Sequence, residues 1–154
     1  MKITNFKTVV DEDNRTQLVK ESSRIYKKHE NMNSQQKIVD LMKDMYELDK
    51  QAVEYVYMIA MNSKNKVLGV YMVSKGTVNA SLLSPREIYI VALMIGAVNL
   101  IIVHNHPSGD TTPSKEDMNS TKRIKDAGEL IGIKLQDHII IGNDYYSMKE
   151  TCTL

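Results

Sequence analysis

From residue 53 onward, short apolar runs alternate with segments that carry helix signals, and this order restricts the chain to a few layer architectures. The runs are rich in β-branched and aromatic residues, which is typical of buried strands. A turn-prone segment at 62–65 joins the first two runs and predicts an antiparallel hairpin, whereas helical crossovers between later runs predict parallel pairing. The sequence therefore predicts an α/β (α+β) fold with a mixed β-sheet flanked by helices. The predicted strands are 53–61, 67–73, 100–103 and 135–141, and the predicted helices are 34–47, 84–97 and 113–131.

Size and composition favour one domain, preceded by a polar arm. The chain has 154 residues, of which 42% are hydrophobic and 25% charged, as in ordinary globular proteins. We expect residues 33–154 to form the domain and residues 1–32 to form an N-terminal arm with at most one strand, around residues 3–10. The arm carries a basic cluster that can contact nucleic acid, but Glu21 and Glu30 interrupt the cluster, which favours a solvated face.

The predicted helix 84–97 begins at a well-marked N-terminus. Ser84 is in the N-cap position, Pro85 is at the first helical position, and Glu87 is placed as the capping-box partner of Ser84. The apolar and methionine-rich face of this helix fits burial in a monomer core, and it also fits a contact between two copies. The sequence therefore leaves monomer or homodimer open.

The helix that begins near residue 113 has two candidate caps. With Thr112 as the cap, Pro113 occupies its favoured first position and the Ser114 hydroxyl is free to point into a site. With Ser114 as the cap, Asp117 is its capping-box partner and only satisfies backbone donors. The position of Pro113 favours Thr112. The inward stripe predicted for this helix is Ile124, Ala127, Leu130 and Ile131, and its end is at Gly132.

Two histidines follow the apolar run 100–103. His104 and His106 are two residues apart at the end of a predicted strand, so both side chains point to the same side. The pair can share a metal ion, or it can be two polar histidines at a site edge. Asp117, one turn into the next helix, can face back toward the strand end and add a carboxylate. Two histidines and one carboxylate leave a fourth zinc position open, which is the usual arrangement in catalytic sites.

A zinc-activated water also needs a general base. Glu54 is the candidate, because an ionisable side chain within the apolar segment 53–58 has to be paired, protonated or at the exposed start of the strand. The sequence alone favours the interpretation without a functional role, in which Glu54 is at the exposed start of the strand. Ser114 can donate to a developing oxyanion if Thr112 is the cap. His138 is interpreted as a structural histidine, with a place beside the site as the alternative.

The segment from His104 to Asp117 resembles the JAMM motif of JAB/MPN-domain metalloproteins. His106, seven intervening residues, Ser114, two more residues and Asp117 match the H-x-H-x7-S-x2-D pattern without a gap. The RadC-type branch, historically called DNA repair proteins, is similar from about residue 33 to 150. The resemblance implies an MPN/JAB-like sheet with cytidine-deaminase-like layering and one Zn²⁺ per chain. It also implies His104, His106 and Asp117 as zinc ligands, Ser114 near the oxyanion and Glu54 as the base.

The leading functional hypothesis is a zinc-dependent hydrolase of the JAMM metallopeptidase type that acts on a peptide or isopeptide carbonyl. The alternative is a catalytically silent MPN-type binding module associated with DNA repair or replication partners. Longer RadC-type proteins carry a helix-hairpin-helix DNA-binding region, but residues 1–50 show no such pattern and the net charge is +1, so nucleic-acid binding stays open. A zinc nucleobase deaminase is excluded, because its P-C-x-x-C element needs two cysteines and the chain has one.

The expected location is the cytoplasm. A single cysteine, Cys152, cannot form an internal disulfide. Residues 1–10 lack the apolar core of a secretion signal, and no run approaches the roughly 20 apolar residues of a membrane span. We therefore expect no contact with a membrane.

Overall fold

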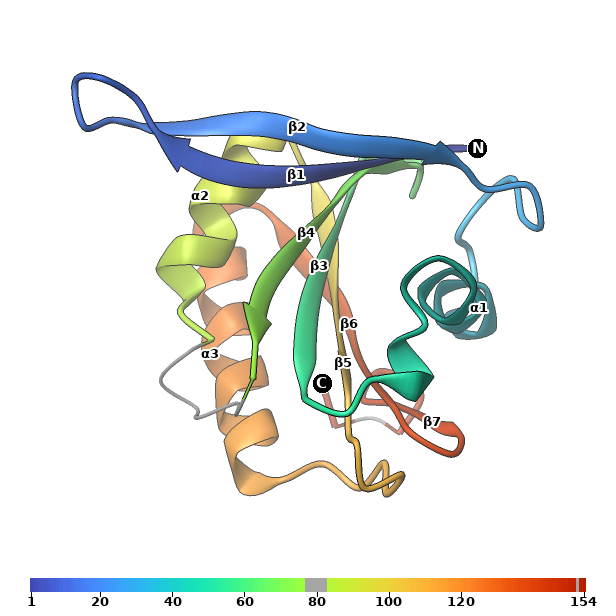
Figure 1. Cartoon of the computed structure of the whole chain (residues 1–154). Helices are drawn as coiled ribbons and strands as arrows, with labels where there is room; N and C mark the ends of the chain where they lie inside the picture. Colours follow the sequence, from blue (N-terminus) through green and yellow to red (C-terminus); the bar gives the residue numbers. More distant parts are fainter. Residues whose placement is uncertain (77–82, 152) are drawn as a thin grey trace.

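The computed structural model describes residues 1–76, 83–151 and 153–154, and within them seven strands form one mixed sheet in the order β2-β1-β4-β3-β5-β6-β7. Helices α2 and α3 cover one face of this sheet, and α1 covers the other (Figure 1). The predicted α/β (α+β) class with a flanked mixed sheet is confirmed. The strands are β1 (Lys2–Val10), β2 (Thr16–Ile25), β3 (Tyr55–Met61), β4 (Val67–Lys75), β5 (Asn99–Asn105), β6 (Lys134–Ile141) and β7 (Tyr145–Ser147). The helices are α1 (Gln35–Tyr46), the 3-10 turn η1 (Leu48–Lys50), α2 (Pro85–Ile95) and α3 (Lys115–Ile131).

The central strand β5 is buried on both faces. Ile101 and Val103 pack in the core cluster beneath α1, whereas Leu100 and Ile102 pack in the cluster beneath α2 and α3. Successive side chains of a strand point to opposite faces, so a strand covered on both sides is apolar at nearly every position. This burial explains the unbroken apolar run that precedes the two histidines.

Strand pairing brings the end of β5 beside the start of β3. Strand β3 pairs antiparallel with β4 and with β5, and Val56 lies opposite His104. The crossover through α3 makes β6 parallel to β5. The end of β5, the residues just before β3 and the first turn of α3 therefore lie at the same end of the sheet.

The N-terminal arm contains two strands where the sequence predicted at most one. Strands β1 and β2 form an antiparallel hairpin, and β1 joins the rest of the sheet by parallel pairing with β4 at Asn5 and Phe6. No residue of β2 is fully buried, so its sequence lacks the alternation that marks a half-buried strand. The other unpredicted strand, β7, is only three residues long.

The caps of α2 and α3 correct two predictions. Ser84 is the N-cap of α2, but its side chain makes no cap hydrogen bond, so the predicted capping box is not formed. Ser114, not Thr112, is the N-cap of α3. The Ser114 Oγ accepts from the Asp117 backbone N–H at 3.0 Å, and Asp117 Oδ2 accepts from the Ser114 N–H at 2.8 Å. This reciprocal pair satisfies two orphan donors, whereas the Thr112 N–H is bonded to Asp110 in the preceding turn.

The inward face of α3 also differs from the predicted stripe. Ile124 is fully buried, but Leu130 is 89% exposed and Ile131 is 42% exposed. Gly128 faces inward, because a side chain there would collide with the Tyr89 hydroxyl and with a backbone carbonyl. Tyr89 of α2 donates to the Ile124 carbonyl at 2.7 Å and so joins the two helices.

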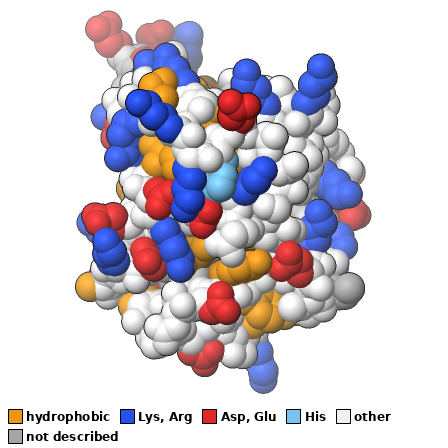
Figure 2. Space-filling view, turned by 90° about the vertical axis from the view of Figure 1, so that its right-hand side faces the viewer, with side chains coloured by type: hydrophobic (Ala, Val, Ile, Leu, Met, Phe, Trp, Pro, Cys, Tyr) orange, Lys and Arg blue, Asp and Glu red, His pale blue; other side chains and the backbone are white. Residues whose placement is uncertain are grey.

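Acidic and basic side chains are interspersed on the face that carries α1 (Figure 2). Within the described residues, no helix combines the length and the apolar character needed to cross a bilayer. Cys152 lies outside the described residues.

Candidate metal centre

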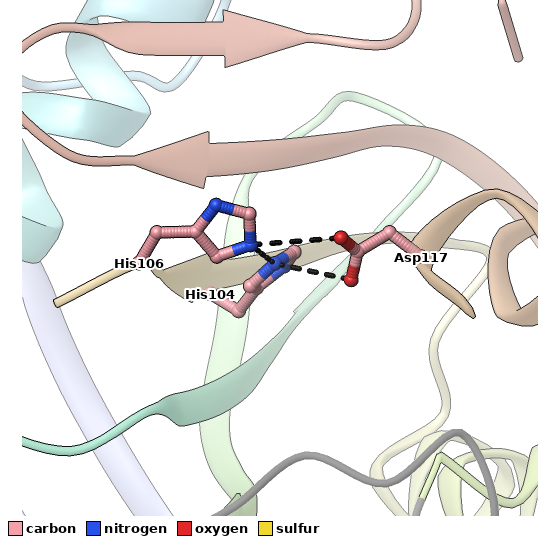
Figure 3. A group of neighbouring side chains, drawn as sticks. All are labelled: His104, His106 and Asp117. Carbon is pink, nitrogen blue, oxygen red and sulfur yellow. Dashed lines mark hydrogen bonds and ion pairs between the residues drawn. The ribbon is translucent and has the colours of Figure 1, made fainter. Parts of the chain in front are cut away.

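Three predicted ligands converge at the end of β5 (Figure 3). His104 is in β5, His106 follows its last residue, and Asp117 is in the first turn of α3. One ligand atom from each residue lies within 4.8 Å of the others. His104 and Asp117 are buried, with 1% and 5% exposure, and His106 is partly exposed to the cleft. The structure therefore brings together the three side chains that the spacing predicted.

Each pair of these residues has donor atoms at a spacing close to that around a tetrahedral zinc ion, with a different Asp117 oxygen meeting each histidine. The two Nε2 atoms of the histidines are 3.0 Å apart, and Asp117 places Oδ1 3.3 Å from His104 Nε2 and Oδ2 3.5 Å from His106 Nε2. Ligand atoms about 2.0 Å from a tetrahedral zinc ion lie roughly 3.3 Å from one another. Two imidazoles and a carboxylate are also a donor set that zinc prefers.

A tight turn orients His106. The Gly109 N–H donates to the His106 carbonyl at 3.0 Å, and Gly109 has a φ of +82°, a conformation that favours glycine. The turn brings the Asp110 carbonyl 2.7 Å from His106 Nδ1. Because a carbonyl oxygen only accepts, Nδ1 carries a hydrogen, and Nε2 is the nitrogen that faces Asp117 and His104.

His104 is oriented by another histidine. His104 Nδ1 lies 2.7 Å from His138 Nε2, and His138 Nδ1 lies 2.5 Å from the Thr121 hydroxyl. The structure thus selects the alternative in which His138 lies beside the site. Thr121 was not predicted, although it lies one turn after Asp117 on the same helical face. A polar side chain within the apolar run 135–141 was the available signal for His138.

Asn105, between the two histidines, holds the chain on both sides of Glu54. Its side-chain oxygen accepts from the Tyr55 N–H at 2.8 Å, and its amide donates to the Val53 carbonyl at 3.1 Å. The Glu54 carbonyl itself accepts from the Gly76 N–H at 2.8 Å. This role of Asn105 was not predicted from the sequence. A buried amide with 2% exposure therefore positions the candidate base relative to the candidate ligands.

Glu54 and Ser114 line a cleft together with His106 and Asp117. Glu54 is half-buried immediately before β3, at the start of the strand, and the cleft has a volume of about 480 Å³. The Ser114 hydroxyl donates to Asp117 Oδ2 at 2.7 Å, because Ser114 and not Thr112 caps the helix. The roles of Glu54 as base and Ser114 toward an oxyanion stay predictions. The cleft is lined by Glu54, His106, Pro107, Ser108, Ser114, Glu116 and Asp117.

Comparison with known proteins identifies the family. The family model described as the RadC-like JAB domain matches residues 32–153, which include both histidines, Asp117 and Glu54. The chain belongs to the RadC-like JAB domain family. The chain is 55% identical over 98 residues to a UPF0758 protein of Clostridium tetani, which covers 63% of this chain and 43% of that protein. It is 50% identical over 111 residues to a UPF0758 protein of Clostridium beijerinckii, with 71% and 47% covered. The chain spans about half the length of the curated relatives it matches.

Membership in the RadC-like JAB family confirms the resemblance drawn from the motif. The JAB domain is compatible with a hydrolase, and the group of His104, His106 and Asp117 is one that can bind a metal ion. The fold agrees, since the mixed sheet with helices on both faces fits a JAB domain.

Burial and close contacts shift the pKa values of the groups at this JAB site. Burial opposes ionisation of Asp117, but hydrogen bonds from His106 and Ser114 and the interaction with His104 outweigh burial, so the pKa of the carboxyl lies well below its ordinary value. Burial and the neighbouring His138 lower the pKa of His104 far below the usual histidine value. Burial likewise lowers the pKa of His138 to about 4. An ionised carboxylate thus lies beside a neutral buried imidazole with its lone pair available.

Proposed function

We propose that this JAB domain is a zinc-dependent hydrolase of the JAMM metallopeptidase type. The observation that carries the proposal is the convergence of His104, His106 and Asp117, whose donor atoms lie 3.0–3.5 Å apart in pairs. His106 and Asp117 also line an open cleft together with Glu54. Three protein ligands and access from solvent leave room for water and substrate, as in catalytic zinc sites. Family membership supports the same reaction class.

Each residue of the site has a role in this reaction. His104, His106 and Asp117 would hold one Zn²⁺. When bound there, zinc supplies Lewis acidity, which polarises a scissile carbonyl and lowers the pKa of a water molecule to about 7. Glu54 takes the proton from the attacking water and returns it to the leaving amine.

The remaining polar group of the cleft is the Ser114 hydroxyl. Its hydrogen is directed at Asp117 Oδ2 in this structure. A hydroxyl rotates readily about its C–O bond, so Ser114 can donate instead to an oxyanion that develops beside Asp117. The same side chain would then both cap α3 and stabilise the transition state.

The substrate class we propose is a peptide or an isopeptide. The cleft is open and contains several carboxylates, Glu54, Glu116 and Asp117. Amide hydrolysis requires a group that takes a proton from water and then protonates the departing nitrogen. Among the carboxylates of the cleft, Glu54 is the one whose backbone Asn105 holds on both sides.

The test begins with metal content. Untagged protein purified without added metal is analysed by elemental mass spectrometry beside the double variant His104→Ala/His106→Ala. About one zinc ion per chain, absent from the double variant, is the expected result for an open catalytic site. No zinc in either protein contradicts the proposal.

Turnover is tested next with Glu54→Gln, which keeps the size of the side chain and removes its basicity. In a screen of peptide and isopeptide substrates, the variant should retain zinc and lose about 10²- to 10⁴-fold in rate. Glu129→Gln, at an exposed site on α3, is the matched control and should keep the wild-type rate. Full activity of Glu54→Gln would remove Glu54 from the reaction. Zinc binding without turnover on any substrate would favour the silent MPN-type binding module.

A further inference from the structure

A chain of buried hydrogen bonds runs from one candidate ligand to another behind the metal centre. His104 Nδ1, His138 Nε2, His138 Nδ1 and Thr121 Oγ1 follow one another at 2.7 Å and 2.5 Å across the two contacts. The chain ends at the Asp117 carbonyl, 2.6 Å from Thr121 Oγ1. His104, His138 and Thr121 are exposed by only 1%, 0% and 3%. Water therefore has little access to any donor or acceptor of this chain.

The carbonyl at the end of the chain determines its direction. The Asp117 carbonyl only accepts, so the single Thr121 hydroxyl hydrogen lies between Oγ1 and that carbonyl. Oγ1 must then accept from His138, which places a hydrogen on His138 Nδ1. In a neutral imidazole the other nitrogen is an acceptor, so His138 Nε2 accepts from His104 Nδ1.

We propose that His138 and Thr121 are positioning residues that fix the tautomer of His104, so that its Nε2 lone pair faces the metal position. The proposal rests on the proposed zinc site and extends it by two residues outside the ligand set. Ligand histidines usually donate their second N–H to a carboxylate, a carbonyl or water. Here the acceptor is another imidazole, that of His138, which can be a donor or an acceptor at Nε2 depending on its tautomer. The Thr121 hydroxyl and the Asp117 carbonyl are therefore needed to fix the tautomer of His138.

If the hydrogen-bond chain ran in the opposite direction, His104 would carry its hydrogen on Nε2. That hydrogen would have an acceptor at the metal position. Asp117 Oδ1 lies 3.3 Å from His104 Nε2 and would accept a hydrogen located there. In that tautomer Nε2 could not bind zinc until the hydrogen moved. The buried chain therefore works against the attraction of the carboxylate, and its removal should weaken zinc binding without changing any ligand.

The two candidate histidine ligands have different hydrogen-bond acceptors at Nδ1, because their surroundings differ. His106 is partly exposed, and a backbone carbonyl, that of Asp110, accepts from its Nδ1 directly. His104 Nδ1 points into the sheet toward β6, where the β5–β6 ladder uses the backbone groups. A side chain from β6 therefore serves as the acceptor.

Thr121→Val is the sharpest variant, because it replaces the hydroxyl by a methyl group of the same shape. Without the hydroxyl, the hydrogen on His138 Nδ1 has no acceptor, which favours the tautomer that carries its hydrogen on Nε2. His138 then donates to His104, and His104 carries its hydrogen on the metal-facing nitrogen. Thr121→Ser keeps the hydroxyl and is the matched control.

The first measurement is the zinc dissociation constant, obtained by competition with a chromophoric chelator. We expect Thr121→Val to bind zinc about ten-fold more weakly than wild type, and Thr121→Ser to bind within about two-fold. We expect His138→Phe to bind 10- to 100-fold more weakly, and His29→Phe, which removes a histidine from another part of the chain, to bind as wild type. Equal affinities of wild type and Thr121→Val overturn the proposal, as does a Thr121→Ser variant as weak as Thr121→Val.

The second measurement observes the tautomer in the zinc-free protein. The chain has four histidines, so long-range ¹H–¹⁵N correlation spectra can assign each ring. His104 should carry its hydrogen on Nδ1 in wild type and in Thr121→Ser, and on Nε2 in Thr121→Val. A purely structural role for Thr121 would not move this signal, so an unchanged His104 tautomer in Thr121→Val overturns the proposal.

The two proposals can fail separately. Absence of turnover leaves the zinc affinities and the tautomers untouched and counts only against the hydrolase. If wild type does not bind zinc, the metal site itself is wrong. If wild type binds zinc and Thr121→Val binds it equally well, the positioning role alone is wrong.

Discussion

Two clusters of histidine and carboxylate side chains lie on opposite faces of the sheet, and they differ in how their charges are balanced. Next to α1, Asp40 accepts from His29 at 2.8 Å, and Lys28 Nζ lies 3.1 Å from Asp40 and 3.4 Å from Asp44. At the metal centre, Asp117 faces His104 and His106 with no lysine or arginine ion pair among the described residues. The first cluster is neutralised by its own side chains, whereas the second has a carboxylate aimed at a position for a cation.

The two clusters show what distinguishes a candidate metal site from a structural ion pair. The α1 cluster joins the segment after β2 to α1, with Tyr26 donating to Asp44 at 3.0 Å. It has one histidine, and a lysine already meets its carboxylates. The metal centre has two imidazoles whose second nitrogens are both occupied, so both Nε2 atoms face the same point. The two clusters therefore differ more in the orientation of their histidine side chains than in their residue types.

The strongest test of this comparison removes one carboxylate from each cluster. Asp117→Asn should lose bound zinc, because the site then lacks its only anionic ligand among the three. Asp40→Asn should retain about one zinc ion per chain. Elemental mass spectrometry on both variants checks the prediction, and zinc retained by Asp117→Asn would mean that the ion binds elsewhere.

Asn105 tests whether the polar groups around the metal centre are as tightly coupled as their burial suggests. Asn105→Ala removes the acceptor for the Tyr55 N–H and should lower the free energy of unfolding by about 2 kcal/mol, since an unsatisfied buried donor costs about 1–3 kcal/mol. Urea denaturation measures the loss. Because no ligand is changed, the zinc stoichiometry should stay the same while turnover falls with the displacement of Glu54. A variant as stable as wild type would contradict the positioning role of the amide.

The α1 cluster predicts a dependence of stability on pH that can be checked in Asp40→Asn. A hydrogen bond from His29, with further bonds from Gln36 and Lys28, lowers the pKa of Asp40 to about 2. A carboxyl group with a lowered folded pKa stabilises the fold above its unfolded pKa of 3.8, and this contribution is lost as the pH falls through the folded value. The Asp40 side chain is 19% exposed, so solvent screens part of the interaction and we expect a loss of about 1 kcal/mol at pH 7. Chemical denaturation at pH 7 and pH 2 should show the difference between wild type and variant shrinking at acid pH.

The smallest expected effect is that of Lys28→Met. The Lys28 side chain is 50% exposed, and exposed ion pairs contribute little and are screened by salt. The variant should lower the melting temperature by less than Asp40→Asn does, and the difference from wild type should diminish further in 1 M salt. A salt-independent loss larger than that of Asp40→Asn would show that packing of the lysine stem, and not its charge, holds the cluster.

Local patterns were enough to predict the central part of the fold and the grouping of the three candidate ligands. The apolar run before His104 marks a strand buried on both faces, because each side chain of such a strand meets a core. The separation of His104 from His106 is one strand period, and Asp117 lies within the first turn of a helix that the sequence predicts to begin near Pro113. The register within one strand or one helical turn follows from backbone stereochemistry, so spacing alone places such residues.

Other features depend on which segments lie side by side, and the sequence alone was not enough for them. Thr112 and Ser114 both have cap chemistry, and the choice was made by the turn that bonds the Thr112 N–H to Asp110. The polar strand β2 forms because β1 offers a pairing edge, which its own composition does not reveal.

The same distinction holds within the candidate site. The residue types and spacing of His104, His106 and Asp117 were determined by one segment of 14 residues, from 104 to 117. The partners that orient them come from elsewhere. The parallel register of β5 and β6 pairs His138 with Ile102, two residues before His104. Asn105 holds the backbone on both sides of Glu54 across the β3–β5 pairing. The sequence by itself therefore determined which side chains can bind a metal, because that depends on chemistry and short-range spacing. The tertiary structure decided which nitrogen each histidine presents and where the candidate base Glu54 lies, because hydrogen-bond direction depends on neighbours that only strand register and helix docking bring into contact.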